Sequence, residues 1–296
     1  MDNARCDSNR ITREYFDSLL VEMRHIDSRL PDTHITLFGQ RFSMPIATAA
    51  LSHLNNTAPD GMEKMAAGAL AAEALCFSGM GEAEEIQDMC ATGARVIKII
   101  KPHADNETVF AKIREAEKAG AFGVGMDIDH AFSGNGDYDD VCGLPMKPKS
   151  SEEMAGFVKA TKLPFIVKGV LSVTDAKKSI EMGAAAIVVS HHHGIMDYAV
   201  PPLMVLPQIV EEIGGRIPIF VDCCIESGMD VFKALALGAD AVCVGRAIMP
   251  PLQKSGADGV TEKLETINRE LKAVMERTAF GSLNEINNSV IHRRSF

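Results

Sequence analysis

Two short apolar runs separated by a helix pattern constrain the fold most strongly. Residues 165–167 and 186–189 contain only apolar, mostly β-branched side chains without polar alternation, which is typical of strands buried on both faces. Between them, Ser172 is suited to cap a helix and Gly183 to end it. A strand, a helix and a second strand of this kind indicate parallel pairing, so the chain is expected to build a parallel sheet covered by helices.

The same alternation continues along most of the chain. We expect buried strands near residues 44–50, 74–77, 94–100, 122–126, 165–167, 186–189, 217–221 and 241–244. The expected helices are near residues 62–72, 83–89, 107–119, 151–161, 174–182, 202–213, 228–237 and 261–277. Gly-Ala pairs recur just before strands, as helix C-caps do. Eight strand–helix units predict an α/β fold of the (β/α)8 TIM-barrel type.

Three segments lie outside this regular pattern. Residues 1–35 are expected to be an N-terminal helical extension, with a helix from Thr12 to Ile26, and residues 35–42 resemble a small hairpin. Residues 130–150 form one long irregular loop after the fourth strand, and loops of this length are usually lids or binding loops. Because barrels of this type run to about 250 residues, residues 1–296 are expected to form a single domain.

Charge and composition exclude several classes of function. The chain has 40 acidic and 30 basic side chains and a net charge of −10, which disfavours nucleic acid as a partner. No apolar run approaches the roughly 20 residues of a membrane span, and the first residues do not resemble a signal peptide. The seven cysteines show no paired spacing, so reduced thiols and a cytoplasmic location are expected.

Polar and small side chains follow the carboxyl ends of the expected strands. In strand order these are Ala49, Ala50 and His53; Ser78; Lys98; Asp127, Asp129 and His130; Lys168; Ser190, His191, His192 and His193; Asp222; and Gly245 and Arg246. Any one of them alone would usually be a solvated or capping group. Their convergence on one face predicts an active site there, and the loops after the last two strands are expected to bind phosphate.

Five segments carry a family resemblance. Residues 167–176, 187–194, 205–209, 221–249 and 270–279 resemble the FMN-dependent α-hydroxy-acid oxidase and dehydrogenase family, which includes lactate oxidase and glycolate oxidase. This chain looks like a divergent and shortened member. The resemblance implies a (β/α)8 barrel that binds FMN, hydride transfer from a small-molecule hydroxy acid or related alcohol to flavin N5, and a homotetramer.

The resemblance also implies roles for individual residues. His192 would be the catalytic base, Asp129 would pair with it, and Lys168 would approach N1 and O2 of the flavin. Asp222, Gly245 and Arg246 would hold the ribityl phosphate. By their place at strand ends we assign Ala49, Ala50, Ser78, Lys98 and Ser190 to the cofactor side, and His53, Asp127, His130 and His191 to the substrate side. His191 is the alternative base, because the chain is one residue shorter than the family pattern after it. Alternation along a strand sends His191 and His193 one way and His192 the other, so at most one or two of the three enter the site.

The chain departs from the family pattern on the substrate side. Ile195 or Met196 stands where the family has an arginine that clamps the substrate carboxylate, and residues 223–228 lack a second arginine. We align residues 98–100 with the family's Gln-Leu-Tyr, so its tyrosine is lost, and Asp127 replaces a threonine. A buried carboxylate without its arginine partner would cost several kcal/mol. Plain lactate or glycolate is therefore not the expected substrate.

Two other classes of function remain open on sequence alone. One is an FMN-dependent reductase or isomerase of the same fold, with His192 as a general acid. The other is a metal-dependent lyase or hydrolase that uses His53, Asp127, Asp129, His130 and the histidine triplet as ligands, although their spacing matches no firm metal motif. A visible spectrum distinguishes the flavin hypothesis from the metal hypothesis.

Overall fold

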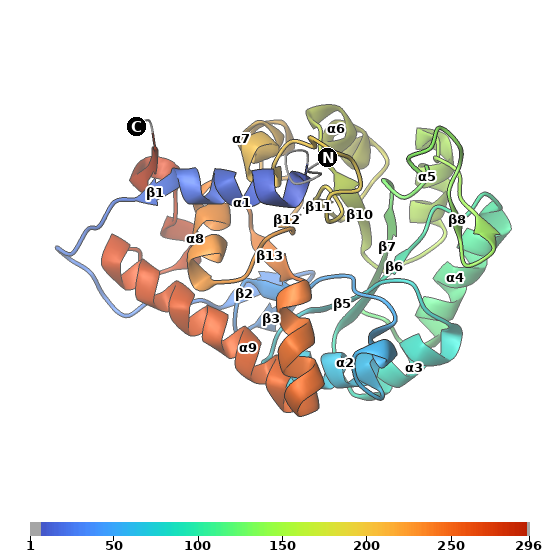
Figure 1. Cartoon of the computed structure of the whole chain (residues 1–296), viewed down its shortest axis with the longest axis horizontal. Helices are drawn as coiled ribbons and strands as arrows, with labels where there is room; N and C mark the ends of the chain where they lie inside the picture. The colour runs from blue at the N-terminus through green and yellow to red at the C-terminus, as the bar shows by residue number, and fades with distance from the viewer. Residues whose placement is uncertain (1–6, 295–296) are drawn as a thin grey trace, which may run out of the picture.

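Eight parallel strands surround the core of the molecule (Figure 1). The computed structural model describes residues 7–294. The strands are β4 (Ile46–Thr48), β5 (Cys76–Ser78), β6 (Val96–Ile100), β7 (Gly123–Asp127), β10 (Phe165–Val170), β11 (Ala186–Val189), β12 (Ile219–Val221) and β13 (Ala241–Val244). They pair in the order β4-β13-β12-β11-β10-β7-β6-β5, and a parallel bridge from Ala47 to Leu75 connects the two ends. The predicted (β/α)8 barrel is confirmed.

Helices follow the strands and cover the outside of the barrel. They are α2 (Gly61–Ala71), α3 (Ala83–Ala91), α4 (Asn106–Lys118), α5 (Ser151–Lys159), α6 (Val173–Glu181), α7 (Pro202–Ile213), α8 (Gly228–Ala236) and α9 (Met249–Thr278). Ser172 caps α6 as expected, since its hydroxyl accepts a hydrogen bond from the Asp175 amide. Helix α9 begins well before the expected Thr261. Its early prolines suit a first turn, and its backbone breaks at Gly256, which has a φ of 59°.

The core has an inner and an outer layer, and strand alternation decides which side chains enter each. Along β6, Ile97 and Ile99 pack with the inner side chains of the barrel, such as Phe77 and Phe220. Val96 and Ile100 instead pack in the outer cluster, between the strands and the helices. Lys98 shares their parity, so its side chain also points toward the helices.

The N-terminal segment differs from the prediction. Helix α1 (Ser8–Ser18) ends earlier than expected, and β1 (Leu19–Val21) pairs antiparallel with β14 (Ile291–Arg293) at the other end of the described chain. The helix predicted from Thr12 to Ile26 is therefore wrong after Ser18. Local apolar periodicity could not reveal the strand, because its partner lies at the far end of the sequence. The predicted hairpin is present as β2 (Ile35–Leu37) and β3 (Gln40–Phe42).

The long loop after β7 carries a short hairpin of its own, β8 (Asp140–Val141) and β9 (Leu144–Pro145). Met146, just beyond it, forms a bridge with His103, which holds this loop beside the segment after β6. Among residues 7–294, no helix is both long and apolar enough to cross a membrane.

Candidate active site

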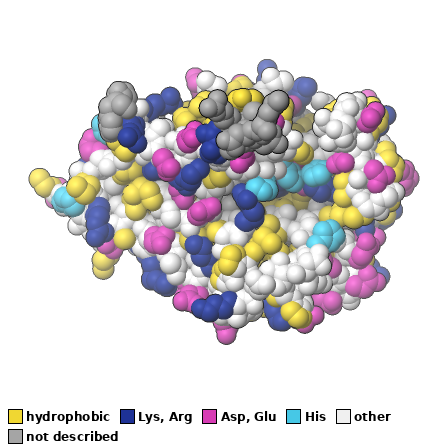
Figure 2. Space-filling model, viewed as in Figure 1, with side chains coloured by type: hydrophobic (Ala, Val, Ile, Leu, Met, Phe, Trp, Pro, Cys, Tyr) yellow, Lys and Arg dark blue, Asp and Glu magenta, His cyan; other side chains and the backbone are white. Residues whose placement is uncertain are grey.

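Two adjoining cavities open at the carboxyl ends of the strands. The first has a volume of about 410 Å³ and the second about 500 Å³, and both are lined by His53, Met80 and Lys101. Volumes of this size are typical of small-molecule and cofactor sites. Figure 2 shows histidine side chains gathered near a hollow in the viewed face of the molecule.

Many of the predicted site residues line the first cavity. They are Ala49, Ala50, His53, His130, Lys168, His192, Asp222, Gly245 and Arg246. The other predicted residues do not line this cavity: Ser78, Lys98, Asp127, Asp129, Ser190 and His191. The first group comes from six different strand ends, as expected for this fold.

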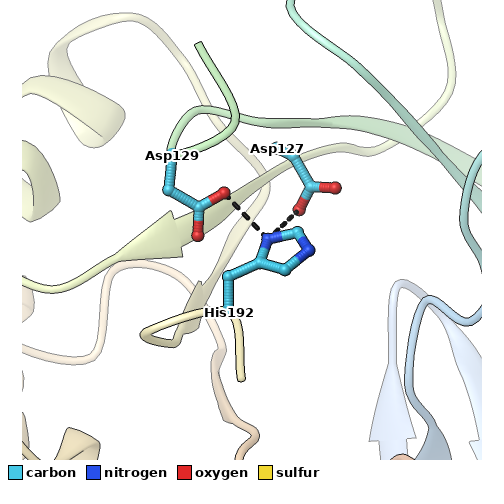
Figure 3. A group of neighbouring side chains, drawn as sticks. All are labelled: Asp127, Asp129 and His192. Carbon is cyan, nitrogen blue, oxygen red and sulfur yellow. Dashed lines mark hydrogen bonds and ion pairs between the residues drawn. The ribbon is translucent and has the colours of Figure 1, made fainter. Parts of the chain in front are cut away.

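His192 and Asp129 form a hydrogen-bonded pair at this cavity (Figure 3). His192 Nδ1 lies 2.9 Å from Asp129 Oδ1 and 3.7 Å from Asp127 Oδ1. A carboxylate only accepts, so the imidazole donates from Nδ1, and its Nε2 then carries a free lone pair. This tautomer is the one that a general base requires, with the carboxylate holding the ring in place.

Asp127 lies beneath the cavity between two ammonium groups. Its carboxylate accepts from Lys101 Nζ at 2.8 Å and from Lys168 Nζ at 2.9 Å. Burial acts to raise the pKa of Asp127, but the charges of Lys168 and Lys101 outweigh it and hold the pKa well below its usual range. With both oxygens bound to ammonium groups and the side chain buried, Asp127 lines neither cavity. Its assignment to the substrate side stays a prediction that this arrangement does not favour.

Lys168 is the buried cation of the first cavity. Burial alone would lower its pKa, but Asp127 and Asp222, which lies 3.9 Å away, raise the pKa above its ordinary value. It therefore keeps its charge at neutral pH. Contrary to the sequence-based expectation, Lys168 does not end its strand, because β10 continues to Val170 through an irregular register at Gly169.

Lys98 does not reach the first cavity. Its side chain lines only the second one, and the charges that act on it include those of Glu85 in α3 and Glu115 in α4. Burial lowers the pKa of Lys98 to about 8, and its Nζ has no hydrogen-bond partner within residues 7–294. Strand parity explains the error, because Lys98 faces the helices. Lys101, just beyond the strand, reaches both cavities instead.

The three consecutive histidines point to different surroundings. His191 Nδ1 accepts from the Gly194 amide at 2.9 Å, so its Nε2 donates to the hydroxyl of Thr12 in α1 at 2.8 Å. Burial lowers the pKa of His191, which keeps it neutral. His191 thus anchors the N-terminal helix and does not line the first cavity, and its assignment to the substrate side stays a prediction. Ser190 is likewise buried, where its hydroxyl accepts from the His192 amide at 2.9 Å.

Strained backbone surrounds the first cavity. His53, His192, His193, Cys223 and Cys224 all line it and all have φ between 47° and 70°, which non-glycine residues seldom adopt. Such conformations cost about 1 to 3 kcal/mol each and cluster at functional sites. Their concentration at one cavity marks these loops as the functional end of the barrel.

Helix α1 packs against the loops after β11 and β12, which carry His193 and Cys224, and against Arg246 after β13. Figure 1 shows α1 lying across this side of the barrel. Asn9 exchanges hydrogen bonds with the backbone and ring of His193, and its carbonyl oxygen lies 3.5 Å from Cys224 Sγ. The Arg246 guanidinium donates to Asn9 Oδ1 at 3.4 Å. The N-terminal extension therefore contributes directly to the wall of the cavity.

Asp127, Asp129 and His192 are also the only described group whose geometry could hold a metal ion, with ligand atoms within 4.8 Å of one another. Two ammonium groups already bind the Asp127 carboxylate. A divalent cation placed there would meet strong repulsion at close range. The arrangement therefore suits proton transfer better than metal binding.

Several lining residues were not predicted from the sequence. They include Asn9, Met80, Lys101, Cys223 and Cys224. Lys101 could have been found by extending the inward parity of Ile97 and Ile99 by two residues. Asn9 gave no such signal, because its position depends on how α1 docks.

The first cavity suits FMN in the chemistry of its walls. Lys168 offers a buried ammonium, Asp222 a carboxylate, and Arg246 an exposed guanidinium at the start of the helical segment Arg246–Ile248 that leads into α9. Ala49 and Ala50 leave one wall free of bulky side chains. An anion-binding rim and a buried cation within one cavity are what a phosphate and an electron-poor ring system require.

Sequence comparisons identify relatives over nearly the whole chain. The model of the family described as FMN-dependent dehydrogenase matches residues 3–159 and 150–293. Glycolate oxidase of Spinacia oleracea is 28% identical over 94% of this chain and 86% of its own length. L-lactate oxidase of a Roseobacter species is 28% identical over 82% of this chain and 75% of its own length.

Solved structures agree with the sequence comparisons. A crystal structure of a mandelate oxidase variant superposes with a TM-score of 0.89 and 28% identity, covering 98% of this chain and 92% of that one. Another variant structure, with a C4a-OH-FMN adduct, gives a TM-score of 0.88 over 97% of this chain. Both similarities therefore cover nearly the whole of this chain.

Proposed function

This chain belongs to the FMN-dependent dehydrogenase family, and from that premise we propose that it oxidises a 2-hydroxy acid larger than lactate or glycolate. Its cofactor is FMN and it is an enzyme of the α-hydroxy-acid oxidase type. The observation that carries the proposal is the His192–Asp129 pair, which presents a free imidazole nitrogen at the cavity that holds Lys168 and Arg246.

We propose that six residues of the first cavity hold the cofactor. They are Ala49, Ala50, Lys168, Asp222, Gly245 and Arg246. When bound, FMN supplies the hydride acceptor of the reaction at its N5. Lys168 contributes a permanent positive charge on the buried side, and in a water-poor site such a charge stabilises developing negative charge strongly. Arg246 contributes a charge-assisted hydrogen bond to the phosphate.

His192 would accept the hydroxyl proton of the substrate at Nε2. The resulting imidazolium is stabilised by Asp129, which already accepts from Nδ1 at 2.9 Å. A positioned general base of this kind contributes about 10² to 10⁴ in rate. His130 lies edge-on to His192, with the ring centroids 4.7 Å apart, and burial lowers the pKa of His130, so it adds no competing positive charge at neutral pH.

Two observations support a substrate larger than lactate. The second cavity adjoins the first at His53, Met80 and Lys101, so there is space beyond the reacting position. Ile195 and Met196, which stand where the family has its carboxylate-binding arginine, are exposed and line neither described cavity. A smaller share of the binding energy then comes from the carboxylate, and more must come from the rest of the substrate.

Anaerobic mixing of the oxidised enzyme with a panel of 2-hydroxy acids tests the proposal. The panel runs from glycolate and lactate to acids with aliphatic and aromatic side chains, and the loss of flavin absorbance near 450 nm is followed. We expect faster bleaching by the larger acids than by lactate. Bleaching by none of them, together with reoxidation of the reduced enzyme by an unsaturated or carbonyl compound, would instead support the alternative of a reductase.

We also propose a homotetramer. Met23, Ile26 and Leu30 lie in the segment between β1 and β2 and are 68%, 87% and 86% exposed. Apolar side chains gathered in this way on a surface often mark a protein interface. A cytoplasmic location is a further proposal, supported by cysteine usage that suits a reducing compartment.

A further inference from the structure

Because the family's carboxylate-binding arginine is absent, another group must bind the carboxylate of the substrate. A substrate carboxylate that enters a cavity needs a cation or several hydrogen-bond donors, because an unpaired buried carboxylate is strongly unfavourable. The cationic side chains that line the first cavity are Lys101, Lys168 and Arg246, within the described part of the chain. Each of them can be examined by what already surrounds it.

Lys168 and Arg246 already have hydrogen-bond partners and are both assigned to the cofactor. Lys168 lies 2.9 Å from the Asp127 carboxylate and 3.9 Å from the Asp222 carboxylate, and these two groups balance its charge on the buried side. Arg246 is exposed on the rim, where it donates to Asn9. Neither is placed to bind a second anion between the two cavities.

Lys101 has unused hydrogen-bond donors at the junction of the two cavities. Its Nζ donates to Asp127 Oδ2 at 2.8 Å, and that is its sole hydrogen bond within residues 7–294. An ammonium group has three donors, so two remain. Lys101 lines both cavities, whereas Asp127 lines neither. A ligand in either cavity can therefore contact the Lys101 ammonium, while the Asp127 carboxylate lies behind the cavity wall.

The carboxylates beside the two ammonium groups are engaged mainly with Lys168 and His192. Asp127 binds both Lys101 and Lys168, Asp222 lies 3.9 Å from Lys168, and Asp129 is paired with His192. Lys101 therefore shares its one carboxylate partner with a second ammonium group. An anion beside Lys101 would meet an ammonium whose charge is only partly compensated.

We propose that Lys101 binds the carboxylate of the substrate, taking the place of the missing arginine. This rests on the proposed oxidation of a 2-hydroxy acid and specifies how such a substrate is oriented. The carboxylate lies at the junction of the cavities, and the 2-hydroxyl group points to His192 Nε2. A single ammonium gives a point contact and not the bidentate grip of a guanidinium. The remainder of the substrate, in the second cavity, must supply the rest of the orientation.

The test uses a 2-hydroxy acid that has no hydrogen on C2 and cannot be oxidised. Binding of 2-hydroxy-2-phenylpropionate to the holoenzyme is measured by the change in flavin absorbance, and its uncharged amide is measured in parallel. We expect the wild type to prefer the acid, and Lys101→Met to weaken acid binding about 10- to 100-fold while leaving amide binding nearly unchanged. Lys101→Arg should keep the preference for the acid.

Two features of the design control for folding. Lys101→Met leaves the Asp127 carboxylate bound to Lys168 at 2.9 Å, so no isolated buried charge is created and the variant should fold. Lys233→Met removes a lysine that is equally buried but bonds to the Phe16 carbonyl, away from both cavities. It should bind acid and amide as the wild type does.

The outcomes separate this proposal from the proposed function. A Lys101→Met enzyme that still prefers the acid overturns the role of Lys101, and so does a wild type that binds acid and amide equally or binds neither. If binding depends on Lys101 but no 2-hydroxy acid bleaches the flavin, the carboxylate site stands and the proposed oxidation fails.

Discussion

The carboxyl group of Asp129 lies against the backbone of Gly169, so closely that a Cβ atom at residue 169 would stand 2.5 Å from Asp129 Cγ. Gly169 also has a φ of +89°, a conformation that other residues rarely adopt. Glycine at this position therefore allows both the irregularity in β10 and the position of the carboxylate that holds His192.

Gly169→Ala should displace Asp129 and release His192 from its hydrogen bond. We expect flavin reduction to slow about 10- to 100-fold, within the usual range for general-base catalysis, while FMN remains bound. Gly120→Ala is the matched control, because Gly120 has a φ of +79° with no atom within 4 Å of the added Cβ. Both variants should lose about 1 kcal/mol of stability from the positive φ, and Gly169→Ala also bears the cost of displacing Asp129. Equal flavin reduction rates in the two would show that Asp129 does not act through its contact with His192.

Arg246→Ala should weaken the retention of FMN. A charge-assisted hydrogen bond to a phosphate contributes about 1.5 to 3 kcal/mol, which corresponds to roughly 10- to 100-fold in affinity. Titration of the apoprotein with FMN measures this directly. Arg269→Ala, which removes an exposed arginine of α9 paired with Glu265, is the control. An unchanged affinity in Arg246→Ala would place the phosphate elsewhere.

Lys98 gives the protein a specific pH dependence of stability. Burial lowers its pKa from 10.5 to about 8 in the folded state, so between these pH values the unfolded chain binds more protons than the folded one. The free energy of unfolding should therefore rise over this window, by about 3 kcal/mol in total. Below pH 8 both states are protonated and the full penalty applies.

Lys98→Met removes this penalty. The variant should be more stable than the wild type by about 3 kcal/mol at pH 7, and the difference should shrink as the pH rises toward 10.5. Urea unfolding of both proteins at several pH values provides the measurement. A difference that stays constant from pH 7 to 10 would mean that Lys98 has an ordinary pKa in the folded state.

The exposed segment between β1 and β2 should take part in the proposed tetramer. Sedimentation at working concentration should give a tetramer for the wild type, and replacing Met23, Ile26 and Leu30 with serine should shift the population toward smaller species. Replacing Met204, which is 42% exposed on α7, serves as the control. A wild type that sediments as a monomer contradicts the proposal.

Sequence patterns located the strand ends, and with them Lys168, Asp222 and Arg246, because buried parallel strands leave a strong apolar signal. The patterns did not show which way a side chain points where this depends on alternation along a strand or on how α1 packs against the barrel. Lys98 was assigned to the cofactor although its parity sends it toward α3 and α4, and Lys101 was overlooked. His191 was placed with the substrate because its contact with Thr12 depends on how α1 packs.

Asp127 shows a further limit of sequence reasoning. Its place after an apolar strand correctly indicated the functional end of the barrel. Whether the carboxylate faces the cavity or lies beneath it depends on the two lysines that bind it, and these come from two other strand ends. Partners contributed by separate strands emerge only in the folded structure.

The most direct test of the account is the rate constant for flavin reduction in His192→Ala, measured by anaerobic stopped-flow with the best substrate of the panel. We predict that the variant binds FMN as tightly as the wild type and is reduced about 10² to 10⁴ times more slowly, since it lacks the group that accepts the hydroxyl proton. Reduction at the wild-type rate would contradict the account, because it would mean that His192 is not the base.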